Sequence, residues 1–286
     1  MTADASAARA LEWKAKNYMD DLPNDIGPFR ELLENYSNIS PENVNEHLHY
    51  IRDKGWDIHR YPCIGRWSFT NIKGLDHPSF RAIIKRLKQR GSQDTFLDVA
   101  CCVGQVLRKL AFDGVDPARL YGTDLSPEFL ELGFELFNDR EKFGPDSFVA
   151  ADLLDPSDEG LKKLEGKVTL VSAGNFFHLF DWDQQVLAAR RIIKFLKPDV
   201  RDAVILGGQI GSSKPGNFTT WTGATRFLHD PKTFQLLWDE AGRTTGIKWK
   251  VSSAWISKTT IDIPGFPDES RYLVYIARQI GPAVSS

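Results

Sequence analysis

The sequence predicts an α/β fold in which helices pack on both faces of a mostly parallel, doubly wound β-sheet. From Thr95 onward, short apolar runs alternate with longer segments of helical periodicity, which is typical of such a fold. The last two strand-like runs, 248–256 and 271–278, have no helix-length segment between them, so we expect them to pair in an antiparallel fashion. A length of 286 residues allows one decorated α/β domain or two small ones.

Five apolar runs are the expected parallel strands, and the helices between them have recognisable ends. The runs cover residues 96–99, 120–123, 148–151, 168–172 and 204–208. Ser126 and Pro127 form a capping residue and a first-turn proline, and Asp230 and Pro231 repeat this pattern before a later helix. A third helix is expected over 184–196, because a lysine and a proline follow it directly.

The first 92 residues differ from the rest because they are predicted to be helical. They include helices over 41–54 and 78–90, with an aromatic-rich loop over 55–75 between them. No linker is long enough to separate independent domains, so we divide the chain into an N-terminal extension, 1–92, and an α/β domain, 93–280, within one compact unit. The apolar helices of the extension are candidates for a homodimer interface.

Composition and charge exclude several classes of function. Lys and Arg number 36 and Asp and Glu number 38, so the net charge of −2 argues against charge-driven binding to nucleic acid or to an anionic membrane. Three cysteines, two of them adjacent, make a poor disulfide framework and a poor zinc site, so no metal is expected. Neither a signal-peptide pattern nor a window long enough for membrane insertion is found, which favours a cytoplasmic location.

The first expected strand runs into a turn with small residues at alternate positions, Ala100, Cys102 and Gly104. A small-residue turn lets the backbone approach a ligand at the N-terminus of the next helix, although a tight turn without a ligand would have the same pattern. The pattern G-x-G-x-x-G, which surrounds a dinucleotide pyrophosphate, is not matched, because Leu107 follows Gly104. An NAD-dependent oxidoreductase is therefore the disfavoured alternative.

Acidic residues are expected at the carboxyl ends of three successive strands: Asp98, Asp124 and Asp152. In a doubly wound sheet these ends converge on the crevice that binds ligands. Asp124 follows Asp98 at close to the spacing of about 20 residues at which an acid reaches the ribose of a nucleoside, and Asp152 could accept a hydrogen bond from an adenine amino group. A nucleoside ligand without a phosphate fits this pattern, and S-adenosylmethionine is such a ligand.

Four segments, FLDVACCVGQ, YGTDLSPEF, FVAADLLDP and VTLVSAGNFFHLFD, resemble in order the motifs of class I S-adenosylmethionine-dependent methyltransferases. The whole chain, including RYPCIGRWSF, is similar to the fungal methyltransferases of meroterpenoid biosynthesis, which methylate a carboxyl group on farnesylated dimethylorsellinate-type intermediates. This resemblance implies a seven-stranded Rossmann-like methyltransferase sheet with its last strand antiparallel. It also implies a hydrophobic small-molecule substrate, and S-adenosylhomocysteine as the cofactor product.

The resemblance also assigns contacts with the cofactor. Asp98 matches the acid that organises its amino-acid end, whereas Ala100, Cys102 and Gly104 occupy three glycine positions, so the sequence departs from the family pattern twice. The other matched residues are Asp124 and Leu125 at the ribose and adenine face, Asp152 and Leu153 at the adenine edge, and Ser172 and Gly174 at the methionine end.

His178 lies where this superfamily often places a residue that faces the substrate. Methyl transfer is an in-line displacement that depends on proximity and on the exclusion of water. A carboxylate acceptor is already ionised at neutral pH, so no base is required for an ester, whereas a phenol of pKa near 10 would need one. We therefore expect a carboxyl O-methyltransferase. The alternatives are a phenol O-methyltransferase that uses His178 as its base and a non-catalytic cofactor-binding partner subunit.

Aromatic residues outside the predicted sheet strands are candidates for substrate binding. Trp67 and Trp221 either pack the N-terminal helices onto the sheet or line a pocket for a prenylated substrate. Arg66 could hold a carboxylate of the substrate or of the cofactor in a bidentate manner. On this interpretation the N-terminal extension is a lid that closes the site and selects the substrate.

Overall fold

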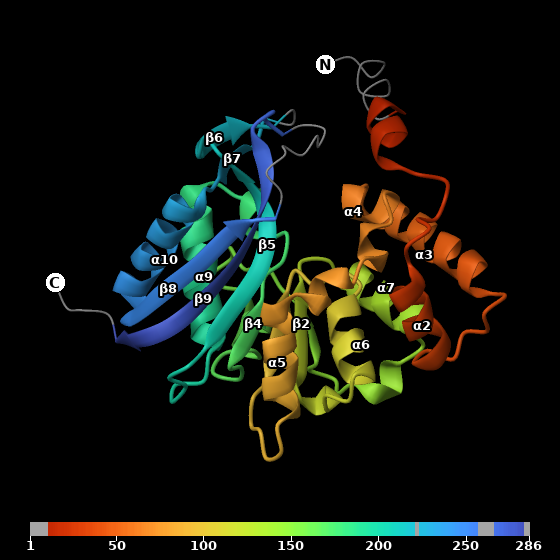
Figure 1. Cartoon of the computed structure of the whole chain (residues 1–286), viewed down its shortest axis with the longest axis horizontal. Coiled ribbons are helices and arrows are strands. Elements are labelled where there is room, and N and C mark those ends of the chain that lie inside the picture. The colour runs from red at the N-terminus through yellow and green to blue at the C-terminus, as the bar shows by residue number, and fades with distance from the viewer. Residues whose placement is uncertain (1–10, 221–222, 257–265, 283–286) are drawn as a thin grey trace. The chain divides into compact units, whose positions relative to one another are not determined.

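The computed structural model describes residues 11–220, 223–256 and 266–282, and its main feature is a seven-stranded β-sheet (Figure 1). Neighbouring strands follow the order β3-β2-β1-β4-β5-β9-β8. The strands in chain order are β1 (Phe96–Val99), β2 (Leu120–Asp124), β3 (Phe148–Ala150), β4 (Leu170–Ser172), β5 (Val204–Ser212), β8 (Ile247–Trp255) and β9 (Ser270–Pro282).

The sheet is mostly parallel, and its last strand runs in the opposite direction. β1 pairs in parallel with β2 and with β4, and β4 pairs in parallel with β5. β9 pairs in an antiparallel fashion with β5 on one side and with β8 on the other. The predicted fold class, including the antiparallel last strand, is therefore confirmed.

Helices alternate with the parallel strands along the chain, as predicted. In chain order they are α2 (Gly27–Asn35), α3 (Val44–Ile58), α4 (Pro62–Gly65), α5 (Pro78–Lys88), α6 (Gln105–Phe112), α7 (Pro127–Phe137), α8 (Glu159–Lys162), α9 (Trp182–Phe195) and α10 (Pro231–Thr245). The predicted caps form at α7, where Ser126 Oγ accepts from the Phe129 amide, and at α10, where Asp230 completes a capping box. None of the described helices has the length and apolar character needed to cross a bilayer.

The described chain forms two compact units. The first combines Met1–Arg90 with Cys101–Ala118 and Ser126–Phe148, and the second combines Gly91–Ala100 with Arg119–Leu125 and Val149–Ser286. In the first unit, α6 and α7 share an apolar core with the N-terminal helices. In the second, α9 and α10 pack with the sheet strands β4, β5 and β9 around a core that contains Ile192, Trp238 and Tyr275.

The N-terminal helices differ from the prediction. The expected helix over 41–54 begins later and runs further, as α3, because the stripe of buried residues Val44, Leu48 and Ile51 continues through Gly55 and Trp56. The region expected to be a loop over 55–75 contains the end of α3, the short helix α4 and two 3₁₀ segments, η1 (Ser68–Thr70) and η2 (Lys73–Asp76).

A buried ion pair lies in the core of the first unit. Arg108 and Asp139 are both fully buried, and two guanidinium nitrogens of Arg108, Nε and Nη2, donate to the two carboxylate oxygens at 2.9 and 3.1 Å. Tyr36 donates its hydroxyl to the same carboxylate at 2.8 Å, and the Phe148 ring lies 4.2 Å from the guanidinium carbon. Burial and this carboxylate raise the pKa of Tyr36 well above its usual value. The network connects α6 with the segment after α7.

We expect the Asp139→Ala substitution to lower the free energy of unfolding by about 3–5 kcal/mol, because it leaves a buried guanidinium without its counter-charge. The control is Glu131→Ala, which removes an ion pair to Arg140 whose two side chains are 63% and 61% exposed. That change is expected to cost less than about 1 kcal/mol. Urea unfolding of both variants measures the difference, and equal losses would contradict a stabilising role for the buried pair.

Candidate active site

The turn that follows β1 has an unusual backbone conformation at the three positions with small residues. Ala100, Cys102 and Gly104 have φ angles of 54°, 53° and 66°, so all three lie in the left-handed region. For a residue with a side chain this conformation costs about 1–2 kcal/mol, which explains why glycine suits these positions. At Gly104 a Cβ atom would also lie 2.2 Å from Arg108 Nη1. The backbone of the turn therefore has the conformation that a close approach to a ligand requires.

Asp98 lies inside β1 rather than at its end. In the sheet register it stands between Gly122 of β2 and Ser172 of β4, and its side chain is 5% exposed. Burial raises its pKa to about 7, with a further contribution from the charge of Asp124, while a hydrogen bond from Ser172 lowers it. The protonated form of Asp98 is therefore favoured more strongly at neutral pH than that of an exposed carboxyl group.

Asp124 and Leu125 follow the predicted pattern at the end of β2. Asp124 is the last residue of the strand and is half-buried, and its carbonyl accepts a hydrogen bond from the Ala151 amide at 2.9 Å. Leu125 is 66% exposed, which is unusual for a large apolar side chain directly after a buried strand. An exposed apolar side chain beside a carboxylate suits a ligand with a polar ribose and a flat base.

Asp152 and Leu153 follow β3. The backbone amide of Asp152 donates to Asp158 at 2.8 Å, and its own Oδ1 accepts from the Leu154 amide at 2.8 Å. These bonds hold the loop in a defined conformation and leave the second carboxylate oxygen for other contacts. Leu153 is buried at 6% exposure, so its side chain belongs to the core of the second unit.

The segment after β4 is held by residues that the sequence did not single out. Tyr275 donates its hydroxyl to the Ala173 carbonyl at 2.7 Å, and Tyr272 donates to the Asn175 side chain at 3.0 Å. At Gly174 a Cβ atom would have nothing within 4 Å, so there is open space beside the backbone where the methionine end of the cofactor is predicted. Both tyrosines come from β9, about 100 residues further along the chain, and no local pattern marks them.

His178 is buried in η5 (Phe177–Leu179), at 6% exposure. Its Nδ1 atom is buried and has no hydrogen-bond partner among the described residues. Burial lowers the pKa of this imidazole to about 3, and the positive charge of Arg226 contributes to the shift. His178 is therefore neutral at physiological pH.

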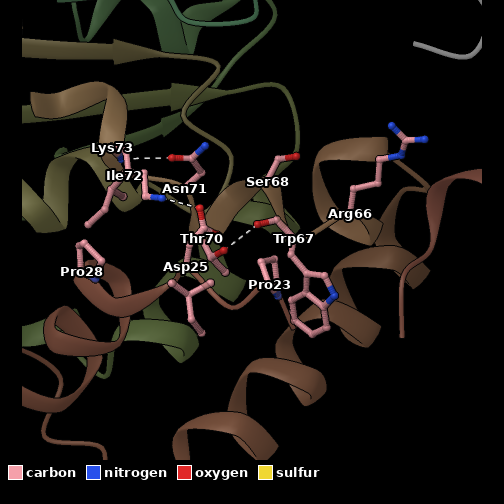
Figure 2. Close-up of a pocket in the computed structure, with 11 residues that line it drawn as sticks. Pro23, Asp25, Pro28, Arg66, Trp67, Ser68, Thr70, Asn71, Ile72 and Lys73 are labelled. Atoms are coloured by element: carbon pink, nitrogen blue, oxygen red, sulfur yellow. Dashed lines mark hydrogen bonds and ion pairs between the residues drawn. The ribbon is translucent and has the colours of Figure 1, made fainter. Parts of the chain in front are cut away.

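Arg66 and Trp67 belong to the first unit, where they line a cavity of about 140 Å³ (Figure 2). Trp67 is 1% exposed, has a left-handed backbone and donates its indole N–H to the Met19 carbonyl at 3.0 Å. Arg66 points away from the other labelled residues in Figure 2, and its Nε and Nη2 donate to the Lys16 carbonyl. Trp221, the third predicted substrate contact, lies outside the described residues.

Comparison with known sequences assigns the chain to a family. Residues 17–70 match the meroterpenoid methyltransferase N-terminal domain, and residues 96–199 match a methyltransferase domain. The chain is 41% identical to the O-methyltransferase phiE of a fungal species over 87% of its own length and 82% of that protein. It is 31% identical to the methyltransferase ausD of Penicillium brasilianum over 82% and 84% of the two chains.

Comparison with solved structures agrees on the fold. Phosphoethanolamine N-methyltransferase 2 of Haemonchus contortus, solved with phosphomonomethylethanolamine and S-adenosylhomocysteine, has a TM-score of 0.50 at 14% identity. The match covers 81% of this chain and 60% of that one. Within the described residues, no group of three or more His, Cys, Asp or Glu side chains is arranged to hold a metal ion.

The sheet order and the sequence matches define an S-adenosylmethionine-dependent methyltransferase with a Rossmann-like fold. More narrowly, the chain belongs to the fungal O-methyltransferase family of meroterpenoid and related secondary metabolism. This membership confirms the resemblance and the cofactor predicted from the sequence, and it sets aside the NAD-dependent alternative.

We expect Gly104→Ala to lower stability more than Gly246→Ala does, although both glycines have left-handed φ angles, 66° and 71°. A Cβ atom at position 246 would meet nothing within 4 Å, so that variant measures only the backbone cost of about 1–2 kcal/mol. At position 104 the clash with Arg108 adds to the same cost. Urea unfolding compares the two variants, and equal losses would show that the turn relaxes around the new methyl group.

We also expect the stability difference between the wild type and Asp98→Asn to depend on pH. The pKa of Asp98 is raised on folding, so the folded state binds this proton more tightly than the unfolded state does. The contribution to stability is complete below pH 4 and is lost as the pH rises to about 7, by a few kcal/mol at most. Unfolding at pH 5, 6, 7 and 8 tests this, since other titrating groups contribute equally to both proteins. A constant difference would contradict the raised pKa.

Proposed function

We propose that the chain transfers a methyl group to the carboxylate of a hydrophobic small molecule and forms a methyl ester. The acceptor class that we infer is a farnesylated aryl acid of the dimethylorsellinate type. The observation that supports the carboxylate is the protonation chemistry of His178, the residue that would have to act as the base for a phenol. Its pKa of about 3 makes it a very weak base.

A comparison of proton-transfer free energies supports a carboxylate acceptor over a phenol. Transfer of a proton from a phenol of pKa near 10 to an imidazole of pKa about 3 is uphill by on the order of 10 kcal/mol. A carboxylic acid of pKa near 4 is ionised before it binds, so no proton has to be transferred in the active site. A site with a neutral, buried imidazole therefore suits a carboxylate and is poorly suited to a phenol.

The residues of the second unit fit S-adenosylmethionine as the methyl donor. When bound, this cofactor supplies an electrophilic methyl group on a sulfonium. Asp124 is proposed to hold the ribose, Leu125 to contact the adenine face and Asp152 to accept from the adenine amino group. The open space beside Gly174 would accept the methionine end, with Asp98 and Ser172 beneath it in the sheet. Leu153 would support this edge from the core.

Other sequence-based roles remain predictions. Ala100, Cys102 and Gly104 keep their predicted backbone contacts with the cofactor, and the left-handed conformation of each supports that role. The predicted role of residues 1–92 as a lid, a homodimer through these helices and a cytoplasmic location are retained as proposals. The substrate contacts predicted for Arg66 and Trp67 are also retained, although in the described structure Trp67 acts as a core residue and Arg66 binds a backbone carbonyl.

We expect the purified protein to add one methyl group to a farnesylated dimethylorsellinate-type acid, and prolonged treatment with hot, strong alkali to remove that methyl group. Esters hydrolyse under these conditions and aryl ethers do not, so the treatment distinguishes the two acceptors in one sample, with mass spectrometry as the measurement. The control substrate lacks the carboxyl group and keeps the phenols, and it should remain unmethylated. An alkali-stable product would establish phenol methylation, and no product from the farnesylated acid would favour a non-catalytic binding subunit.

A further inference from the structure

A short β-hairpin that the sequence did not predict lies beside η5. It consists of β6 (Gly216–Thr219) and β7 (Thr225–Leu228), in which Phe218 and Arg226 stand directly opposite each other. The Phe227 amide donates to the Phe180 carbonyl at 2.9 Å, which connects β7 to the end of η5. The Ser212 amide donates to the His229 carbonyl, so the hairpin also lies beside the end of β5, as Figure 1 shows.

Four side chains from separate segments meet at this hairpin, and we name them the hairpin cluster: His178, Phe218, Arg226 and Phe266. The Phe266 ring is at the centre, with its centroid 5.8 Å from that of His178 and 5.4 Å from that of Phe218. The guanidinium carbon of Arg226 lies 6.0 Å from the same centroid. All four residues belong to the second unit.

The chemistry of the hairpin cluster matches an anion on an apolar body. Arg226 supplies a permanent positive charge and a planar set of donors that suits a carboxylate. His178, being neutral, carries one ring N–H that can donate a hydrogen bond, and its buried Nδ1 has no partner among the described residues. Phe218 and Phe266 provide aromatic surface on which an aryl ring can pack.

The position of the cluster is appropriate for the methyl acceptor. His178 lies four residues beyond Gly174, on the segment that follows the carboxyl end of β4. That segment is where the methionine end of the cofactor, which carries the reactive methyl group, is predicted to lie. The residues proposed to bind the anion and those predicted to bind the methyl donor therefore include neighbours on the same short segment after β4.

We propose that Arg226 and His178 bind the substrate carboxylate, with Phe218 and Phe266 packing against the ring that bears it. This inference rests on the proposed function, and it adds Arg226 to Arg66 as a residue proposed to bind a carboxylate. One carboxylate oxygen is held by the two side chains. The other donates an electron pair to the methyl carbon as the carbon–sulfur bond breaks and its electrons pass to sulfur. No proton is released, and the neutral ester no longer attracts the guanidinium, which favours its release.

The proposal is tested with Arg226→Gln and Arg226→Lys, with Arg243→Gln on the exposed end of α10 as the control. Loss of a charge-assisted contact should raise the KM for the aryl acid about 10-fold or more in Arg226→Gln. Arg226→Lys, which keeps the charge, should be intermediate, and Arg243→Gln should match the wild type. Calorimetric titration with S-adenosylhomocysteine should give the same affinity for all four proteins, which shows that each is folded.

A second readout separates recognition of the carboxylate from a structural role. The carboxamide analogue of the substrate serves as a competitive inhibitor, and the wild type should bind the acid more tightly than the amide. Arg226→Gln should lose this preference, because the contact it removes is specific to the anion. A folded Arg226→Gln protein that keeps the wild-type KM and the preference for the acid would overturn the proposal.

The proposed role of His178 as a hydrogen-bond donor is tested by measuring KM and kcat separately. His178→Asn keeps a donor and should remain active, whereas His178→Phe should raise KM. A loss of kcat by 10²–10⁴-fold in His178→Asn, with KM unchanged, would indicate a general base instead and would overturn the donor role. Failure of the proposed function is distinguishable from failure of this inference. The former gives an alkali-stable product with the wild type, and the latter gives an ester with unchanged kinetics in Arg226→Gln.

Discussion

Burying an ionisable side chain costs free energy unless the group is paired or neutral, and this constraint determines the chemistry of the molecule. Arg108 reduces this free-energy cost by pairing with Asp139 in the first unit. For Asp98, between two neighbouring strands, a raised pKa favours the uncharged form. For His178, a lowered pKa keeps the imidazole neutral. The first solution stabilises the fold. The other two support the proposed function, because they determine which protons are available near the predicted cofactor and substrate.

The residues proposed to bind the cofactor and the residues proposed to bind the methyl acceptor come from different features of the fold. Asp124 and Asp152 lie at the carboxyl ends of β2 and β3, whereas Asp98 lies inside β1, and the cofactor role proposed for these acids uses this arrangement. Two members of the hairpin cluster, Phe218 and Arg226, come from β6 and β7, which lie outside the main sheet. In other proteins of this fold, a different insertion after β5 could therefore bind a different acceptor without altering the strand ends.

Much of the fold could be predicted because its signals are local. The capping residues Ser126 and Asp230 begin their helices where expected. Each expected apolar run overlaps a strand, although β5 extends to Ser212, beyond the expected end at residue 208. The helix expected over 41–54 begins too early, because Ser40 and Pro41 resemble a helix start signal. The stripe of buried residues on α3 begins only at Val44. The hairpin of β6 and β7 was missed because its alternate residues are only half-buried and give weak periodicity.

The sequence by itself determined the class of fold, the turn after β1, the positions of the strand-end acids and the family. Each of these follows from residue type and spacing along a few neighbouring positions. Only the tertiary structure decided the burial of His178 and of Asp98, the contacts of Tyr272 and Tyr275, and the placement of Arg226 and His178 around the Phe266 ring. These depend on how much water is excluded around a group and on partners up to about 100 residues away, and neither quantity is encoded in local pattern.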